Sequence, residues 1–236
     1  MNSPPRWQYD EMKQVGTDYD NKSQVSSYDK KMQKLRDIKK ETENIIEVLG
    51  ISPDHTVLEI GTGTGEFALS AANLCKKVIA LDVSQTMLEY AKEKAVERSI
   101  CNLEFHHAGF LTYEHNGAPV DAVVSQLALH HLPDFWKLIA LQRICCIMKD
   151  QGRLYLKDTV YSFDVHKYWE FFNDLVSSIH MSAGKEIAGD VQLAIRDEYS
   201  TCDWVMEEIL KRVGFNIDEK EYLEGFIAVY ICTKIK

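Results

Sequence analysis

The chain has 236 residues, enough for one large α/β domain, and 45% of them are hydrophobic and 27% charged, which is typical of a folded protein with a sizeable core. Its formal net charge of -9 argues against DNA or structured RNA as a partner. No segment approaches the roughly 18 consecutive apolar residues that a membrane span requires. The six cysteines show no metal-binding spacing, and free thiols without a secretion signal predict a cytoplasmic protein.

The N-terminal part of the chain differs in pattern from the remainder. Residues 1–27 are polar, rich in tyrosine and weakly periodic, and we expect a loop or short helices that pack onto the domain. Apolar residues at helical spacing predict a helix over residues 28–49, which Gly50 would end. We therefore expect residues 1–44 to form an N-terminal lid and residues 45–236 to form the main domain.

Strands and helices then alternate along the chain. Strands are predicted at 55–60, 77–83, 102–107, 120–126 and 153–159, and helices at 66–75, 85–98 and 133–148. Residues 162–199 interrupt this alternation with an aromatic-rich helical insertion. After a last helix at 202–213, strands at 215–222 and 226–233 are typical of a hairpin. The pattern predicts an α/β fold with a Rossmann-like, doubly wound, mostly parallel seven-stranded sheet and an antiparallel terminal hairpin.

A glycine-rich turn follows the first predicted strand, and an acidic residue ends the second. The turn runs Gly61-Thr62-Gly63-Thr64-Gly65, and its glycines allow backbone amides to approach a ligand closely. Asp82 is placed to accept hydrogen bonds from two ribose hydroxyls. Ligands of parallel sheets bind outside the carboxyl ends of the strands, where the strand order reverses. The turn, Asp82, residues 108–110 and Gln126 should therefore meet in one nucleotide-type crevice.

These segments resemble the motifs of class I S-adenosylmethionine-dependent methyltransferases, and residues 121–132 are similar to the fourth-strand motif of small-molecule members such as those of ubiquinone and menaquinone biosynthesis. The resemblance implies that Asp82 holds the ribose and that Val83 and Met87 form an apolar floor under adenine. It implies S-adenosylmethionine as the cofactor. The predicted cofactor-binding residues are Tyr28, Glu59, Gly61, Thr62, Gly63, Gly65, Asp82, Val83, Met87, Gly109, Phe110, Gln126 and Leu127.

Gly109 departs from the family pattern, which commonly places an aspartate at this position at the adenine edge. The group that receives the adenine amino hydrogen is therefore open, and a backbone carbonyl or a neighbouring side chain are the alternatives. Glu66 stands where a dinucleotide fingerprint would have its third glycine. A carboxylate at that helix N-terminus would repel a pyrophosphate, whereas S-adenosylmethionine carries no phosphate.

Five side chains are candidates for the chemistry of an acceptor. His130 and His131 follow the fourth strand and are expected either to act as a base or acceptor-orienting group, or simply to hydrogen-bond the loop. Asp158 ends the fifth strand and could line the acceptor site or stabilise a turn. Arg196 and Tyr199 belong to a polar cluster before the last helix and could bind an anionic or carbonyl-bearing acceptor.

Aromatic residues near the N-terminus (Trp7, Tyr9, Tyr19 and Tyr28) are expected either to cover the cofactor or to attach their segment to the core. The histidines form no evident metal set, so we predict metal-independent, in-line methyl transfer to a small molecule. The alternatives are a nicotinamide-dependent oxidoreductase, a non-catalytic binding module, and a methyltransferase acting on protein or RNA. No oligomeric state is predicted.

Overall fold

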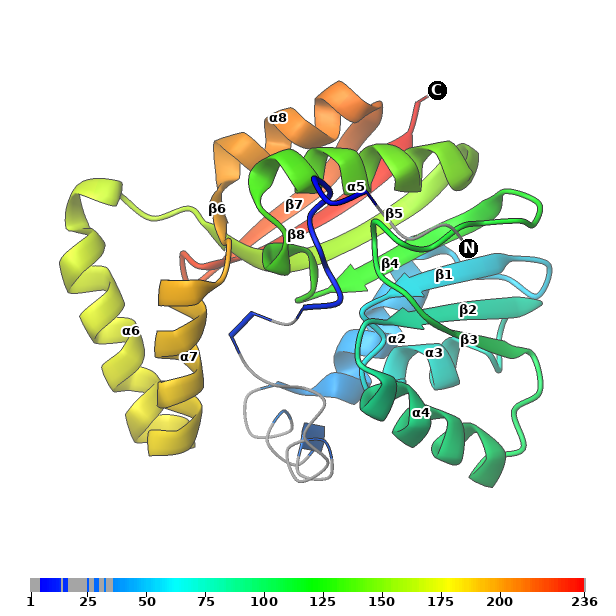
Figure 1. Cartoon of the computed structure of the whole chain (residues 1–236), viewed down its shortest axis with the longest axis horizontal. Helices are drawn as coiled ribbons and strands as arrows, with labels where there is room; N and C mark the ends of the chain where they lie inside the picture. The colour runs from blue at the N-terminus through cyan, green and yellow to red at the C-terminus, as the bar shows by residue number, and fades with distance from the viewer. Residues whose placement is uncertain are drawn as a thin grey trace.

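The computed structural model describes residues 5–13, 15–16, 25, 28–29, 32 and 36–235, and it contains a central sheet with helices on both faces (Figure 1). The strands are β1 (Thr56–Ile60), β2 (Lys77–Asp82), β3 (Leu103–His107), β4 (Val120–Gln126), β5 (Met148–Tyr161), β6 (Thr201–Cys202), β7 (Phe215–Leu223) and β8 (Ile227–Lys234). The α-helices are α2 (Ile38–Leu49), α3 (Glu66–Ala71), α4 (Gln85–Glu97), α5 (Asp134–Ile147), α6 (Tyr168–Ala183), α7 (Lys185–Asp197) and α8 (Asp203–Val213), with single 3₁₀ turns at Leu129–His131 and Val165–Lys167.

The strand order is β3-β2-β1-β4-β5-β8-β7, with the two-residue β6 beside β5. β1 to β5 pair in parallel, and β8 runs antiparallel to both β5 and β7. This arrangement confirms the predicted doubly wound sheet with a reversed terminal hairpin. The order reverses between β1 and β4, because β2 lies on one side of β1 and β4 on the other. A ligand crevice is expected at that point.

Alternate side chains of the strands enter two separate cores. In β1, Leu58 packs with α5 and α8, in the cluster that contains Leu141, whereas Val57 packs with Ile45 of α2 and Phe67 of α3. α4 covers β2 and β3. Both faces of β1, β2 and β4 are thus covered by helices, which explains why these central strands are mostly apolar and buried.

Local sequence features set several element ends where they were expected. The hydroxyl of Ser84 accepts the amide hydrogen of Met87 at 3.1 Å and caps α4. Gly214 ends α8 in the left-handed conformation, with φ of 104°. α3 differs from the prediction: it ends at Ala71, before the predicted end at Cys75, and a turn leads from it into β2.

The inserted segment forms two helices that stand away from the sheet (Figure 1). α6 has no buried residue, and Trp169 and Met181 on it are 73% and 83% exposed. At the other end of the chain, α2 runs without a break across residues 44 and 45, so the division predicted there falls inside a helix. In the described part of the chain, no helix combines the length and apolar character needed to cross a membrane.

Candidate active site

A cavity lies at the carboxyl ends of β1, β2 and β4, where the strand order reverses. Ten of the predicted cofactor-binding residues line it: Tyr28, Gly61, Gly63, Asp82, Val83, Met87, Gly109, Phe110, Gln126 and Leu127. The structure adds Glu11, Ile60, Ala108, Ala128, His131 and Leu132 to this lining. Glu59 and Thr62 line an adjoining cavity that shares Tyr28, Gly61, Gly63 and Gln126 with this one, and Gly65 lines neither. The binding roles of all these residues stay predictions.

Two close contacts shape the glycine loop after β1. Gly61 has φ of 76°, and a β-carbon added to it would lie 2.4 Å from that of Ala128, so only glycine fits between this loop and the loop after β4. The amides of Gly63 and Ser84 donate to the two carboxylate oxygens of Asp82 at 2.7 and 2.8 Å. These bonds fix the carboxylate at the cavity wall, and an ionised carboxylate can accept further hydrogen bonds on the same oxygens.

Glu59 stabilises the glycine loop from behind. Its side chain is buried and accepts a hydrogen bond from the hydroxyl of Thr62 at 2.6 Å. Burial raises the pKa of Glu59 to about 8, because the charged form is poorly solvated there. Glu59 therefore stabilises the conformation of the glycine loop and also lines the adjoining cavity.

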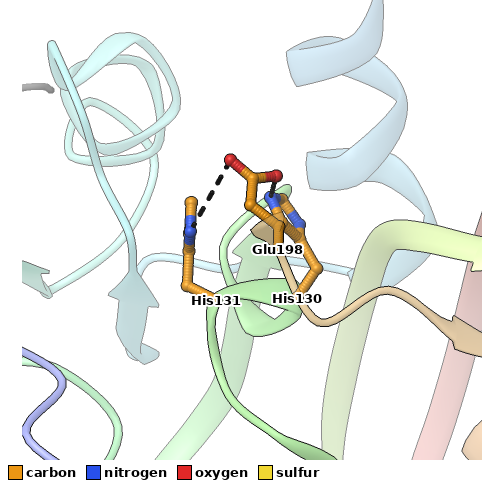
Figure 2. Close-up of side chains that lie close together, drawn as sticks. All are labelled: His130, His131 and Glu198. Atoms are coloured by element: carbon orange, nitrogen blue, oxygen red, sulfur yellow. Dashed lines mark ion pairs between the residues drawn. The ribbon is translucent and has the colours of Figure 1, made fainter. Parts of the chain in front are cut away.

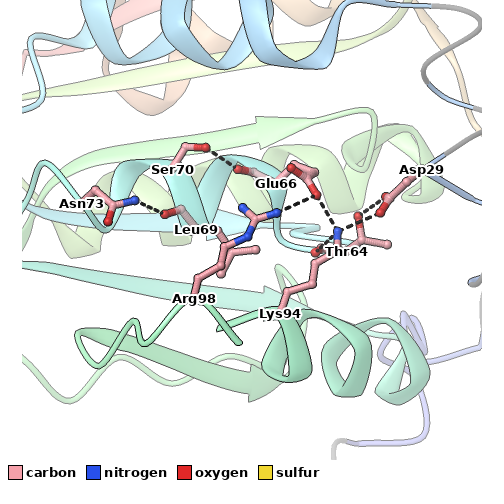
Figure 3. Close-up of polar contacts among 8 residues, drawn as sticks. All are labelled: Asp29, Thr64, Glu66, Leu69, Ser70, Asn73, Lys94 and Arg98. Carbon is pink, nitrogen blue, oxygen red and sulfur yellow. Dashed lines mark hydrogen bonds and ion pairs between the residues drawn. The ribbon is translucent and has the colours of Figure 1, made fainter. Parts of the chain in front are cut away.

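A polar cluster attaches the N-terminal segment to the glycine loop (Figure 3). Asp29 accepts a hydrogen bond from the hydroxyl of Thr64 at 2.6 Å and forms an ion pair with Lys94 at 2.8 Å. The same ammonium group contacts the Glu66 carboxylate at 2.5 Å, and Arg98 lies 3.8 Å from it. Glu66 is therefore a paired charge in this cluster, and its repulsion of a phosphate is weaker than its position alone suggested.

His130 lies on the loop that follows β4, beside the carboxylate of Glu198 (Figure 2). Its Nδ1 contacts Asp158 Oδ1, and its Nε2 lies 3.2 Å from Glu198 Oε2. Burial alone would lower the pKa of His130, but the two carboxylates outweigh it and raise the pKa to about 10. The ring is an imidazolium that donates to both partners, and it cannot serve as a proton acceptor near neutral pH.

His131, unlike His130, lines the cavity. Its Nδ1 lies 4.0 Å from Glu198 Oε1. Burial, together with the positive charge of His130, lowers the pKa of His131 to about 4. The ring is thus neutral near pH 7, where it can orient a ligand by hydrogen bonding but is a weak base.

Comparisons with known proteins agree with this geometry. A family model described as a methyltransferase domain matches residues 57–152. YrrT, an uncharacterized methyltransferase of Halobacillus halophilus, is 26% identical over 179 residues, which are 76% of this chain and 78% of YrrT. Residues 57–152 therefore form a methyltransferase domain, and the chain is similar to a methyltransferase over 76% of its length.

Solved structures of methyltransferases share the fold. One from Aquifex aeolicus has a TM-score of 0.63 at 17% identity, covering 91% of this chain and 98% of that protein. Magnesium protoporphyrin IX methyltransferase of Synechocystis, solved with bound S-adenosylhomocysteine, has a TM-score of 0.61 at 17% identity, covering 83% of this chain and 82% of that one. At such identities the likeness concerns the fold alone.

The remaining predicted residues of this methyltransferase lie outside the cavity. Asp158 is 1% exposed and holds both the ring and the backbone amide of His130. The Arg196 side chain is 70% exposed and pairs with the adjacent Asp197. The amide of Tyr199 donates to the carbonyl of His130 at 2.9 Å. These placements connect Asp158 and Tyr199 to the histidine loop, whereas Arg196 faces solvent.

The predicted aromatic cover is only partly present among the described residues. Tyr28 lines the cavity, and the hydroxyl of Tyr9 donates to the carbonyl of His131 at 3.0 Å. Trp7 is 76% exposed, and Tyr19 lies outside the described residues. Among the four aromatic residues, Tyr9 and Tyr28 are thus the two that the structure places at the site.

Three buried charged residues at the site were not predicted. Glu198 belongs to the polar cluster that was noted at 196–201, but Arg196 and Tyr199 were favoured over it. Lys137, fully buried in α5, donates to the carbonyl of Tyr199 and pairs with Asp134 at 2.8 Å. Glu11 lies in a polar stretch without periodicity. Only Glu198 was open to detection, through the density of polar residues around it.

One group of side chains among the described residues has donor atoms close enough to hold a metal ion. It consists of His130, His131 and Glu198, whose donor atoms all lie within 4.8 Å of one another. In the described geometry, both ring nitrogens of His130 are engaged by carboxylates. Metal binding would require Nε2 to exchange its proton for the ion, with Asp158 as the supporting carboxylate.

Substitution of Asp158 by asparagine tests the charge of His130. We expect Asp158→Asn to lower the free energy of unfolding at pH 7 by roughly 3 kcal/mol, because one carboxylate of a buried ion network is lost. The folded-state pKa of His130 is about 10, above its unfolded value of about 6.5. The stabilisation is therefore complete below the unfolded pKa and is lost as the pH rises through the folded pKa.

The measurement is urea unfolding of wild type and variant from pH 7 to about 10.5, where the difference between them should shrink by up to about 1.4 kcal/mol per pH unit. Asp150→Asn is the matched control, because the Asp150 side chain is 84% exposed. A difference that stays constant or grows with pH would show that His130 is not held as an imidazolium.

Proposed function

We propose that this methyltransferase binds S-adenosylmethionine in the cavity at the carboxyl ends of β1, β2 and β4, and transfers its methyl group to a small molecule. The observation that carries the proposal is the Asp82 carboxylate, which the amides of Gly63 and Ser84 hold at the cavity wall. A fixed carboxylate at the end of the second strand suits the two hydroxyls of a ribose.

The residues around Asp82 suit the rest of such a cofactor. Met87 and Val83 offer apolar surface beside the carboxylate, and Gly61 and Gly63 bring backbone close to the cavity without side chains. When bound, S-adenosylmethionine supplies an activated methyl group on a sulfonium, so the protein needs mainly to align the acceptor. The donor set fits an adenosyl cofactor without phosphate.

A small acceptor is favoured by the surroundings of the cavity. His131 and Leu132 line the cavity beyond the end of β4, and the N-terminal segment contributes Glu11 and Tyr28 to its wall. A site walled on several sides suits a small molecule. The formal net charge of -9 would oppose a nucleic acid. We assign α6 and α7 to the lid that selects the acceptor, because they extend from the carboxyl edge where the methyl acceptor must enter.

Catalysis by this site rests on alignment. His131 is neutral and weakly basic, so it would hydrogen-bond the acceptor and hold it in line with the methyl group. His130, held by Asp158 and Glu198, would fix the position of the loop that carries His131. No step of this mechanism requires a metal ion.

Cofactor binding is tested by isothermal titration calorimetry with S-adenosylmethionine and S-adenosylhomocysteine. Wild-type protein should bind both, and Asp82→Asn should weaken binding by on the order of 1–3 kcal/mol, because a charged hydrogen-bond acceptor is lost. Asp150→Asn should leave both affinities unchanged. Thermal unfolding without ligand separates loss of binding from loss of folding. Binding of NAD in place of both adenosyl compounds would favour the oxidoreductase and overturn the proposal.

The acceptor class is tested with methyl-labelled S-adenosylmethionine and a cell extract. We expect label in the small-molecule fraction with wild-type protein and little with Asp82→Asn, because the variant loads less cofactor. The fractions are separated by acid precipitation and nuclease digestion, and the labelled product is identified by mass spectrometry. Label that precipitates with protein, or that is released only by nuclease, would replace the small-molecule acceptor with a macromolecular one.

Metal independence is tested on the same transfer assay. We expect the rate to be unchanged after dialysis against EDTA, because alignment by neutral His131 needs no Lewis acid. Metal content, measured by plasma mass spectrometry, should lie well below one ion per chain. The opposite outcome is that EDTA removes activity, one divalent ion restores it, and His131→Ala abolishes both the restored activity and metal binding. That outcome would assign His130, His131 and Glu198 as metal ligands.

A further inference from the structure

Glu11 lines the cavity and has one satisfied and one unsatisfied carboxylate oxygen. Its side chain belongs to the N-terminal segment and is buried, with 7% of its surface exposed. Oε1 accepts hydrogen bonds from the amides of Leu111 and Thr112 at 2.8 and 2.7 Å and from the hydroxyl of Thr112 at 2.7 Å. Oε2 is buried without a hydrogen-bond partner among the described residues.

A buried carboxylate oxygen without a partner would be stabilised by a hydrogen-bond donor. Leaving a buried polar atom unpaired costs about 1–3 kcal/mol, and more when the group is charged. Burial raises the pKa of Glu11, although hydrogen bonds from the side chain of Thr112 and from the backbone of Leu111, Thr112 and Phe110 oppose the shift. A ligand N–H directed at Oε2 would compensate the lost hydration.

Gly109 provides the space that this carboxylate occupies. A β-carbon added at Gly109 would lie 2.5 Å from Glu11 Oε2 and 2.6 Å from its carboxyl carbon. Contacts this short require one group to shift, so a side chain at position 109 would displace the Glu11 carboxylate from its present place. The turn that has no acidic side chain at position 109 thus receives a carboxylate from a distant part of the chain.

The residues that line the cavity indicate which ligand atom would contact Oε2. Glu11 and Gly109 line the same cavity as Asp82, Val83 and Met87. If Asp82 takes the ribose, a base placed over Val83 and Met87 would lie in the part of the cavity that Gly109 and Glu11 also line. The exocyclic amine of adenine is an uncharged N–H donor on the edge of such a base, which is what an unpaired carboxylate oxygen requires.

We propose that Glu11 recognises the adenine amino group of the cofactor, in the role that an aspartate at position 109 would otherwise have. The inference rests on the proposed function, since it assumes an adenosyl ligand. It makes the N-terminal segment a part of the cofactor site and a determinant of base specificity. A purely structural role, in which Glu11 only attaches this segment to the turn at 111–112, is the competing explanation.

The test compares S-adenosylhomocysteine with S-inosylhomocysteine, in which a carbonyl oxygen replaces the amino group, by titration calorimetry. Wild type should bind the adenosyl compound about tenfold more tightly or better, because a carbonyl oxygen facing Oε2 leaves both acceptors unpaired. In Glu11→Gln, whose amide can donate to that carbonyl, adenosyl affinity should fall about tenfold, while inosyl affinity is kept or improved.

A rescue variant separates recognition from attachment. Gly109→Asp alone should bind poorly, because its carboxylate meets that of Glu11. In the double variant Glu11→Ala/Gly109→Asp, the new carboxylate occupies the vacated space, and preference for the adenosyl compound should return. Asp10→Asn, at the exposed neighbouring position, is the control for charge on the segment. Thermal unfolding without ligand is measured for every variant.

The outcomes distinguish this inference from the proposed function. If Glu11→Gln lowers the affinity for both ligands equally, or changes neither affinity, Glu11 has no role in recognising the base. The proposed cofactor site would then stand without this inference. Failure of the double variant to regain discrimination would also contradict the recognition role. Wild-type protein that binds neither compound would overturn the proposed function, and this inference with it.

Discussion

The reversal of strand order between β1 and β4 determines where the functional groups of this protein lie. β1 continues through α3 to β2 on one side, and β4 continues through α5 to β5 on the other. No crossover helix fills the space above the two carboxyl ends in the described part of the chain, so the loops after β1 and β4 border a cavity. The contact of Gly61 with Ala128 joins these two loops directly. The glycine loop and the loop that carries His130 and His131 are thereby fixed relative to each other by the sheet.

The N-terminal segment completes the site that the sheet opens. It contacts three separate loops: Asp29 holds the glycine loop through Thr64 and Lys94, Glu11 holds the turn after β3, and Tyr9 holds the carbonyl of His131. These contacts are polar and span the cavity from one side to the other. Ordering such a segment has an entropic cost, which a ligand touching Glu11 and Tyr28 would help to offset. Cofactor binding and closure of the acceptor site would then be coupled.

The parts of the fold that depend on local chemistry could be predicted from the sequence. The capping hydroxyl of Ser84, the stop at Gly214 and the apolar strand β4 each arise from residues within a few positions. The glycine loop and Asp82 share this property, because motif spacing encodes them. The contacts of Glu11 and Lys137 could not be predicted in this way. Each pairs with a residue far away in the sequence, and a charged residue in a polar or helical stretch is most often solvent-exposed.

The histidine pair shows why a motif alone does not assign chemistry. The sequence favoured neither of the two adjacent histidines after β4 as a base, yet their surroundings in the structure give them different charge states. His130 lies between Asp158 and Glu198 and keeps its proton, whereas His131 lies beside that positive charge and stays neutral. The difference comes from which ring faces the carboxylates, a tertiary property.

This division of roles bears on the acceptor as well. One imidazolium and two carboxylates leave one negative charge in excess behind His131, in a setting with little solvent to screen it. Such a field favours positive charge in the cavity, which suits a sulfonium donor and the partial positive charge on a methyl group in transit. The same field disfavours an acceptor that must lose a proton and become an anion before it is methylated.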